Sequence, residues 1–286
     1  MRTNTQPSST GAYNVLLEIT NGETSDYNAL QVQFRKRLSA TVQMQLSYTW
    51  SHSIDSSSTD FGFGGGFATL FNSGQRGDSD YDIRQNVTFS GSWRLPSPSN
   101  GAIFNPIRHW YVDFLAAAHT PLPFDLQGVS TDTSCSSSST TSCSNTGGLF
   151  AQVRPDWDGE AIWVFDPNAP DRKRLNPNAF VIPSGYEQGT LGRNSLRGFG
   201  FAQLDLAVRR TIPLGERLQI NIVGEGYNIL NHPNFANPSP LEGANLSSPN
   251  FGVATQMLNQ SFGGGVNSLY RSGGPRSMEL SLRLQF

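Results

Sequence analysis

Strict alternation of polar and apolar residues marks two stretches of this chain. Between Ala40 and Ser51 the even positions are apolar and the odd positions are polar, without exception. The stretch Ser277–Phe286 alternates in the same way and closes on an aromatic residue. Successive side chains of a β-strand project to opposite sides, so each stretch predicts a strand with one apolar and one polar face.

Strand length separates two interpretations of this pattern. The stretch 40–51 holds twelve residues. Soluble strands average about 5–6 residues, whereas a tilted strand that crosses a bilayer needs about 9–11. The length therefore favours a membrane strand, with a strand of a large soluble β-sandwich as the alternative.

The alternation recurs in about eight segments, at residues 13–20, 27–38, 40–51, 83–95, 110–118, 202–210, 218–225 and 277–286. Short turns at 38–39 and 212–216 contrast with long polar connections at 52–80, 119–200 and 231–275. Outer-membrane barrels combine short periplasmic turns with long extracellular loops. We therefore predict an all-β fold, an antiparallel outer-membrane β-barrel segment of about eight strands. Residues 1–286 would form one partial barrel, with 119–200 as a long extracellular loop region within it.

Two sets of side chains are expected to face opposite media. The predicted lipid-facing belt consists of Val42, Met44, Leu46, Tyr48, Trp50, Phe89 and Trp93. The predicted lumen-facing set consists of Gln43, Gln45, Asp82, Arg84, Asp205, Arg209, Glu279 and Arg283. In the last strand we expect a C-terminal barrel-insertion signal, made of Leu280, Leu282, Leu284 and Phe286. Amphipathic rings of the belt would rest at the level of the lipid headgroups.

Composition narrows the class of protein. Charged residues make up 15% of the chain, against about 25% in an ordinary soluble domain. Mean hydropathy is −0.37, and no apolar run reaches the ~18 residues that a spanning helix needs. A helical membrane protein is thereby excluded. The formal net charge of −2 gives no basic surface for nucleic acid.

The residues that resemble chemical motifs do not form a convincing active site. Asp78, Asp80 and Asp82 alternate and could offer carboxylate oxygens to Ca²⁺, but Arg84 continues the same face, which favours ion pairs at the lumen rim. The glycine-rich run Phe61–Phe67 opens no helix and so fails as a phosphate loop. We expect no enzyme activity, no metal and no cofactor.

Cys135 and Cys143 flank a serine- and threonine-rich run within the longest connection. An extracellular or periplasmic setting permits a disulfide between them, which would contribute at most about 2–3 kcal/mol by the chain-entropy estimate. Two free thiols in a polar tract are the other interpretation. The sequence leaves both open.

Several sequence stretches resemble the barrel domain of TonB-dependent receptors of the Oar-like type, which carry a carboxypeptidase-regulatory-like domain. These stretches are Asp26–Gln33, Leu46–Asp55, Ser79–Arg84, Asn176–Phe180, Gly192–Gly198 and Tyr227–Phe235, followed by the final Phe286. They occur in the family's order over nearly the whole chain. The resemblance implies the C-terminal part of a 22-stranded barrel that imports a bulky ligand through a plugged pore, driven by the TonB complex.

The departures from that family qualify what the chain does alone. It contains no plug, no TonB-contacting segment and no regulatory-like domain, and residues 1–10 read as no secretory signal. We expect a fragment that contributes barrel wall and ligand-contacting loops and is not active by itself. A signal peptide outside this chain would direct it to the outer membrane of a Gram-negative-type bacterium.

The expected partners are outer-membrane lipid, the barrel-assembly machinery and an unidentified small ligand such as a carbohydrate or peptide. The TonB complex would act only through the missing N-terminal parts. Two alternatives stay open. One is a small, self-contained outer-membrane pore or adhesion barrel. The other is a secreted soluble β-protein that binds carbohydrate.

Overall fold

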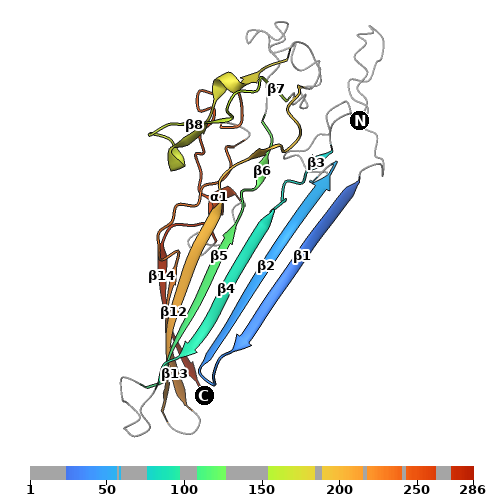
Figure 1. Ribbon diagram of the computed structural model, residues 1–286. Coiled ribbons are helices and arrows are strands. Elements are labelled where there is room, and N and C mark those ends of the chain that lie inside the picture. Colours follow the sequence, from blue (N-terminus) through green and yellow to red (C-terminus); the bar gives the residue numbers. More distant parts are fainter. Residues whose placement is uncertain are drawn as a thin grey trace, which may run out of the picture.

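One antiparallel sheet dominates the computed structural model, which describes residues 24–56, 58, 76–96, 108–126, 154–183, 189–214, 218–239, 243–261 and 272–286. Its long strands are β1 (Ser25–Arg37), β2 (Val42–Asp55), β4 (Gln85–Arg94), β5 (Trp110–His119), β12 (Phe201–Pro213), β13 (Gln219–Tyr227) and β14 (Ser277–Gln285). They lie side by side in chain order, and the short β3 (Gly77–Asp78) pairs with β2. The all-β meander is confirmed (Figure 1). The predicted strand 13–20 lies outside the described residues.

The turns of the sheet set its register. Ser39 Oγ accepts hydrogen bonds from the amides of Thr41 and Val42, both at 3.1 Å, and the Leu38 amide donates to Val42 O at 3.0 Å. This side-chain-capped turn fixes the pairing of Arg37 with Gln43 in the β1–β2 hairpin. β1, β4 and β12 end, and β2, β5 and β13 begin, at one end of the sheet, and the other end leads into the long connections (Figure 1).

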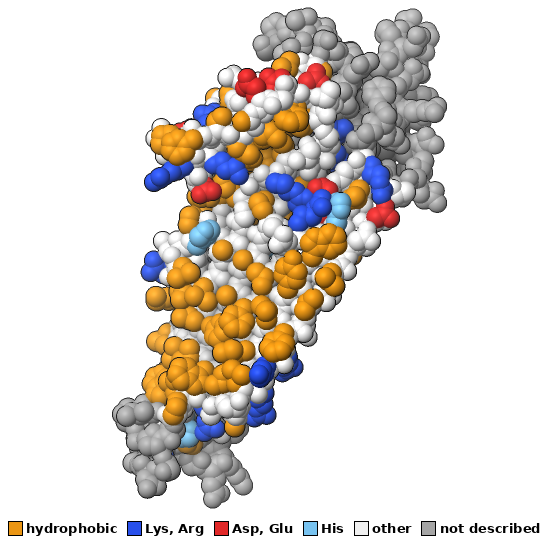
Figure 2. Space-filling model, in the orientation of Figure 1, with side chains coloured by type: hydrophobic (Ala, Val, Ile, Leu, Met, Phe, Trp, Pro, Cys, Tyr) orange, Lys and Arg blue, Asp and Glu red, His pale blue; other side chains and the backbone are white. Residues whose placement is uncertain are grey.

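The register collects apolar side chains on one face of the sheet. A single row runs from Phe34 through Leu46, Phe89 and Ala116 to Leu204. All seven residues of the predicted belt lie on this face, because Trp93 pairs with Val42 and Phe89 with Leu46. Figure 2 shows these hydrophobic side chains as a band over the strands, with charged groups toward both ends.

This apolar face is not covered by a second layer of the described residues. Leu46, in the middle of the band, is 40% exposed, and Leu282 on β14 is 71% exposed. A soluble β-sandwich would bury such side chains between two sheets. A single-layered sheet with one apolar and one polar face is instead the construction of a barrel wall.

Close packing on the apolar face depends on Gly91. The Phe114 ring covers this glycine, so a Cβ at position 91 would lie 2.5 Å from Phe114 Cε1. Phe114 also meets Phe89 edge to face, with ring centroids 5.0 Å apart. Gly91 therefore lets an aromatic pair from neighbouring strands settle against the sheet.

The buried hydrophobic core lies in the long connections rather than on the sheet. It consists of Phe124, Leu126, Leu175, Ala179, Phe180, Leu191, Leu196, Ala244 and Phe251. We call the described residues of 120–200 and 228–261 the cap, which sits beyond the long-connection end of the strands (Figure 1). The predicted loop region 119–200 thus contains a packed part.

Short strand pairs organise the cap. They are β6 (Pro123–Phe124) with β11 (Leu196–Arg197), β7 (Asp156–Trp157) with β10 (Phe180–Val181), and β8 (Trp163–Phe165) with β9 (Lys173–Leu175). Two 3₁₀ turns, η1 (Pro170–Arg172) and η2 (Pro177–Ala179), and the four-residue α1 (Leu258–Ser261) complete it. No helix within the described ranges is long and apolar enough to cross a membrane.

We predict that Leu46→Arg and Ser47→Arg have opposite outcomes although they alter adjacent residues of β2. Arginine at the centre of a lipid-facing strand costs about 2–4 kcal/mol, whereas a substitution on the wetted face usually stays within about 0.5 kcal/mol. The measurement is the protease-protected fraction that floats with phospholipid vesicles. Equal losses for the two variants would contradict the assignment of the faces.

Candidate functional site

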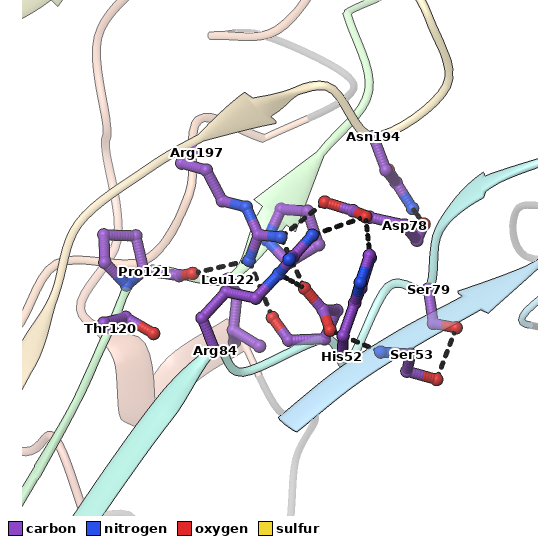
Figure 3. Close-up of polar contacts among 12 residues, drawn as sticks. His52, Ser53, Asp78, Ser79, Arg84, Thr120, Pro121, Leu122, Asn194 and Arg197 are labelled. Carbon is purple, nitrogen blue, oxygen red and sulfur yellow. Dashed lines mark hydrogen bonds and ion pairs between the residues drawn. The ribbon is translucent and has the colours of Figure 1, made fainter. Parts of the chain in front are cut away.

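A cluster of charged side chains joins the cap to the ends of β2 and β4. We call His52, Asp78, Asp82, Arg84 and Arg197 the rim cluster. Figure 3 labels His52, Asp78, Arg84 and Arg197. His52 lies near the end of β2, Asp78 ends β3, and Asp82 and Arg84 lie in the loop that leads into β4. Arg197 comes from β11 in the cap, far along the chain. The cluster therefore connects segments that are distant in sequence.

Two guanidinium groups and two carboxylates alternate within the rim cluster. Arg84 binds Asp78 Oδ1 through Nη2 at 2.9 Å and Asp82 Oδ2 through Nε at 2.7 Å. Arg197 Nη2 binds both carboxylates and its Nη1 donates to the Asp82 carbonyl at 2.8 Å. His52 Nε2 lies 3.1 Å from Asp78 Oδ1. Each carboxylate is thus held by two arginines.

The buried position of Asp82 makes these contacts important. Asp82 is 1% exposed, and burial by itself raises the pKa of a carboxyl group. The hydrogen bonds from Arg197, the Ser53 amide and Arg84 outweigh burial and hold the pKa of Asp82 below its ordinary value. For Asp78, hydrogen bonds from His52 and Arg197 likewise outweigh burial and lower the pKa. Both groups are therefore anionic at neutral pH.

A second set of contacts from the cap meets β2 beside the rim cluster. Arg193 Nη1 binds Asp55 Oδ1 at 2.5 Å, and the side chains are only 8% and 1% exposed. Asn194 Nδ2 donates to Asp80 Oδ1 at 2.6 Å and to Asp78 O at 2.8 Å. Asn194 adopts a positive φ of 51°, a conformation that asparagine tolerates well. This turn aims both side chains at the sheet end.

Gly198 permits the close approach of the cap segment to a neighbouring loop. A Cβ at this position would lie 1.9 Å from Asn237 Oδ1. The Gly198 amide also donates to Leu122 O at 3.2 Å. A larger residue would displace the Asn237 side chain, whose Nδ2 donates to Pro123 O at 3.0 Å.

A separate group of buried polar side chains lies where β12 begins and β13 ends. Asn228 and Asn234 are 1% and 0% exposed. Asn228 Nδ2 donates to His232 O at 2.9 Å and Gly274 O at 2.8 Å, while Asn234 Oδ1 accepts from the Ala202 amide at 2.9 Å. Asp205 accepts from the Asn228 amide at 2.8 Å. Buried amides here replace the strand ladder where the chain leaves the sheet.

The other predicted lumen-facing residues lie along the polar face of the sheet. By register, Gln43, Gln45, Asp205, Arg209, Glu279 and Arg283 all share that face. Arg209 binds Asp113 with an Nε–Oδ2 distance of 2.9 Å. Asp82 and Arg84 were predicted on this face but precede the sheet strand, because β4 begins at Gln85 rather than Ile83. Both side chains belong to the rim cluster.

The remaining predicted residues are placed as follows. Leu280, Leu282 and Leu284 lie on the apolar face of β14, and Phe286 is 98% exposed. The candidate disulfide Cys135–Cys143 and the run 61–67 lie outside the described residues. In the described ranges no group of three or more His, Cys, Asp or Glu side chains is arranged for a metal. Asp78 and Asp82 bind arginine instead.

Comparison with known proteins identifies the family. A family model described as "Outer membrane beta barrel domain" matches residues 2–272. The chain belongs to the outer membrane beta barrel domain family. No curated protein and no solved structure matches the chain. An outer-membrane location follows for this protein.

Five residues that make polar contacts at this end of the sheet were not predicted from the sequence: His52, Asp55, Arg193, Asn194 and Arg197. A signal for them was nevertheless present. Leu46–Asp55, Ser79–Arg84 and Gly192–Gly198, three of the stretches that resemble TonB-dependent receptors, contact one another here, and Asp78, one residue before the second stretch, supplies further contacts. The stretches meet in space although they are far apart in the chain.

We predict that Arg197→Gln loosens the cap. Removing one partner of a buried ion pair costs about 3–5 kcal/mol, and the partial exposure of Arg197 reduces this to about 2–3 kcal/mol. Cleavage within 154–200 by chymotrypsin, which does not cut at arginine, should speed up by at least tenfold. Arg172→Gln, at an exposed position of the same cap, is the control. Unchanged cleavage of Arg197→Gln would show that the rim cluster does not fasten the cap.

We also predict an acid-sensitive contribution of Asp82 to stability. Its folded-state pKa lies below its ordinary value, so the contribution is complete above the unfolded pKa of about 3.9 and is lost as pH falls through the folded value. Burial raises the pKa of Asp125. Ionisation of Asp125 therefore lowers stability as pH rises, which is opposite to the effect of Asp82. The difference in urea midpoint between the native chain and Asp82→Asn should stay constant from pH 7 to 5 and shrink below pH 4. A difference that grows toward low pH would contradict this assignment.

Proposed function

We propose that this chain is part of an Oar-like TonB-dependent receptor and contributes barrel wall and ligand-contacting loops to energy-coupled uptake. The observation that supports the proposal most is the convergence of Leu46–Asp55, Ser79–Arg84 and Gly192–Gly198 through ion pairs and a hydrogen bond. A chance resemblance in separate stretches would not be expected to unite the same stretches in space. Membership of the outer-membrane barrel family agrees with it.

Strand direction favours a wall that includes further strands. The seven long described strands are joined by successive antiparallel pairings. β1 and β14 therefore run in the same direction, and joining them directly would create a parallel pair. Closing an antiparallel barrel requires an even number of strands, so an odd number must be added. The strand predicted at residues 13–20, strands outside this chain, or both would supply this number.

The cap is the proposed ligand-contacting part. In our proposal the long connections are extracellular and the short turns periplasmic. The cap presents exposed rings at Trp157 and Phe165, which are 47% and 73% exposed. Such rings can stack on a carbohydrate or on a peptide side chain. A packed core beneath them reduces the ordering cost of binding.

The proposed partners follow from the two faces and the last strand. The apolar face would contact outer-membrane lipid, and β14 would be recognised by the barrel-assembly machinery. The TonB complex would act through segments outside this chain. We propose no catalytic role and no nucleic-acid partner.

Two measurements test this proposal. Sequencing the reading frame upstream of residue 1 should reveal an in-frame plug and a TonB-contacting segment. The purified chain, refolded in detergent, should give no SDS-resistant band that changes mobility on boiling, because its edge strands lack partners.

Other results would favour the alternatives. A sharp heat-modifiable band together with sugar permeability of reconstituted vesicles would indicate a small pore. Partition into the aqueous phase during detergent extraction would instead indicate a soluble carbohydrate-binding protein.

A further inference from the structure

Two arginines flank one tyrosine on the polar face near the short turns. Tyr111 of β5 pairs in register with Arg94 of β4 on one side and Arg209 of β12 on the other. The guanidinium carbons of Arg94 and Arg209 lie 6.0 Å and 4.8 Å from the centroid of the Tyr111 ring. The strand register thus holds both guanidinium groups close to one aromatic ring.

This group lines a hollow in the polar face. The hollow has a volume of about 350 Å³, and Arg37 from β1 completes its cationic lining. The side chains of Ser39, Thr41 and Ser92 also contribute to the wall. The site therefore combines three guanidinium groups with hydroxyl groups in a space large enough for a small solute.

The charge of the hollow is not balanced by the described residues. Asp113 binds Arg209 at 2.9 Å. Among the described residues, no salt bridge involves Arg37 or Arg94. Like charges gathered on a concave surface raise the local potential and attract anions. The hollow accordingly has an excess of positive charge.

We propose that this hollow binds the phosphate group of a soluble solute, through Arg37, Arg94 and Arg209. Guanidinium groups donate paired hydrogen bonds to the oxygens of phosphate, and Arg37 and Arg94 can do so here. Asp113 binds Nε and Nη2 of Arg209, so Arg209 offers its Nη1, and the neighbouring hydroxyls can donate to the remaining oxygen. The hollow is on the face opposite the apolar band, so a bilayer lipid does not reach it. A phosphate ester dissolved in the lumen is the occupant that this position favours.

The test uses titration calorimetry on the full-length outer-membrane protein in nonionic detergent at constant ionic strength. Inorganic phosphate and glycerol 3-phosphate serve as soluble probes, and dihexanoyl phosphatidic acid serves as the lipid probe. We expect saturable 1:1 binding of the soluble probes. Arg94→Gln should weaken this binding at least tenfold, because it removes a guanidinium group from the hollow. The fold should be unaffected, since Arg94 makes no salt bridge with any described residue.

Arg283→Gln is the matched control. Arg283 lies on the same polar face in β14 but does not line the hollow, so binding should be unchanged. Arg94→Lys is a second variant that keeps the charge and removes the paired donors, and it should fall between native protein and Arg94→Gln.

Three results would overturn the proposal. The first is no saturable phosphate binding to the native protein. The second is an equal loss in Arg94→Gln and Arg283→Gln, which would indicate a diffuse counter-ion cloud. The third is binding of the lipid probe alone, which would assign the site to a headgroup.

Discussion

Backbone pairing between neighbouring strands is the constraint on which this structure depends. In lipid no water is available to satisfy a free N–H or C=O group, so each strand of the wall must be paired along its length. Side chains alternate with a period of two, and a register slip of one residue would exchange the apolar and polar faces. The capped turn at 38–41 and the direct pairing of Leu46 with Phe89 therefore determine which medium every later strand meets.

The rim cluster builds on that register. Asp78 and Asp82 come within reach of Arg84 because β2, β3 and β4 are aligned at their ends. Arg197 then adds a partner from the cap, and the cap has a hydrophobic core of its own. Apolar burial thus holds the cap together, while ion pairs and hydrogen bonds orient it on the sheet. The two kinds of interaction act in different parts of the molecule.

The faces of the sheet could be predicted, but the cap could not. Alternation alone places Leu46 and Gln45 on opposite faces of the sheet, as the register does, because strand geometry is local. Leu126 and Leu175 are fully buried, yet neither belongs to a periodic run, so nothing nearby in sequence marks them as core. The contact between Asp82 and Arg197 spans 115 residues. A pair of this separation depends on how the long connections fold back, which no local pattern encodes.

The contacts within the resembling stretches also indicate where ligand specificity should not be sought. Asp55, Asp82 and Arg193 are buried and hydrogen-bonded to one another's segments, so a ligand could reach them only by breaking the attachment of the cap. Their residue types are explained by that attachment alone. In the receptor role proposed above, specificity would therefore come from cap side chains that are free of this attachment, and the exposed rings of Trp157 and Phe165 meet this condition. Receptors of this construction could then exchange ligands by changing the outer cap while keeping the rim cluster.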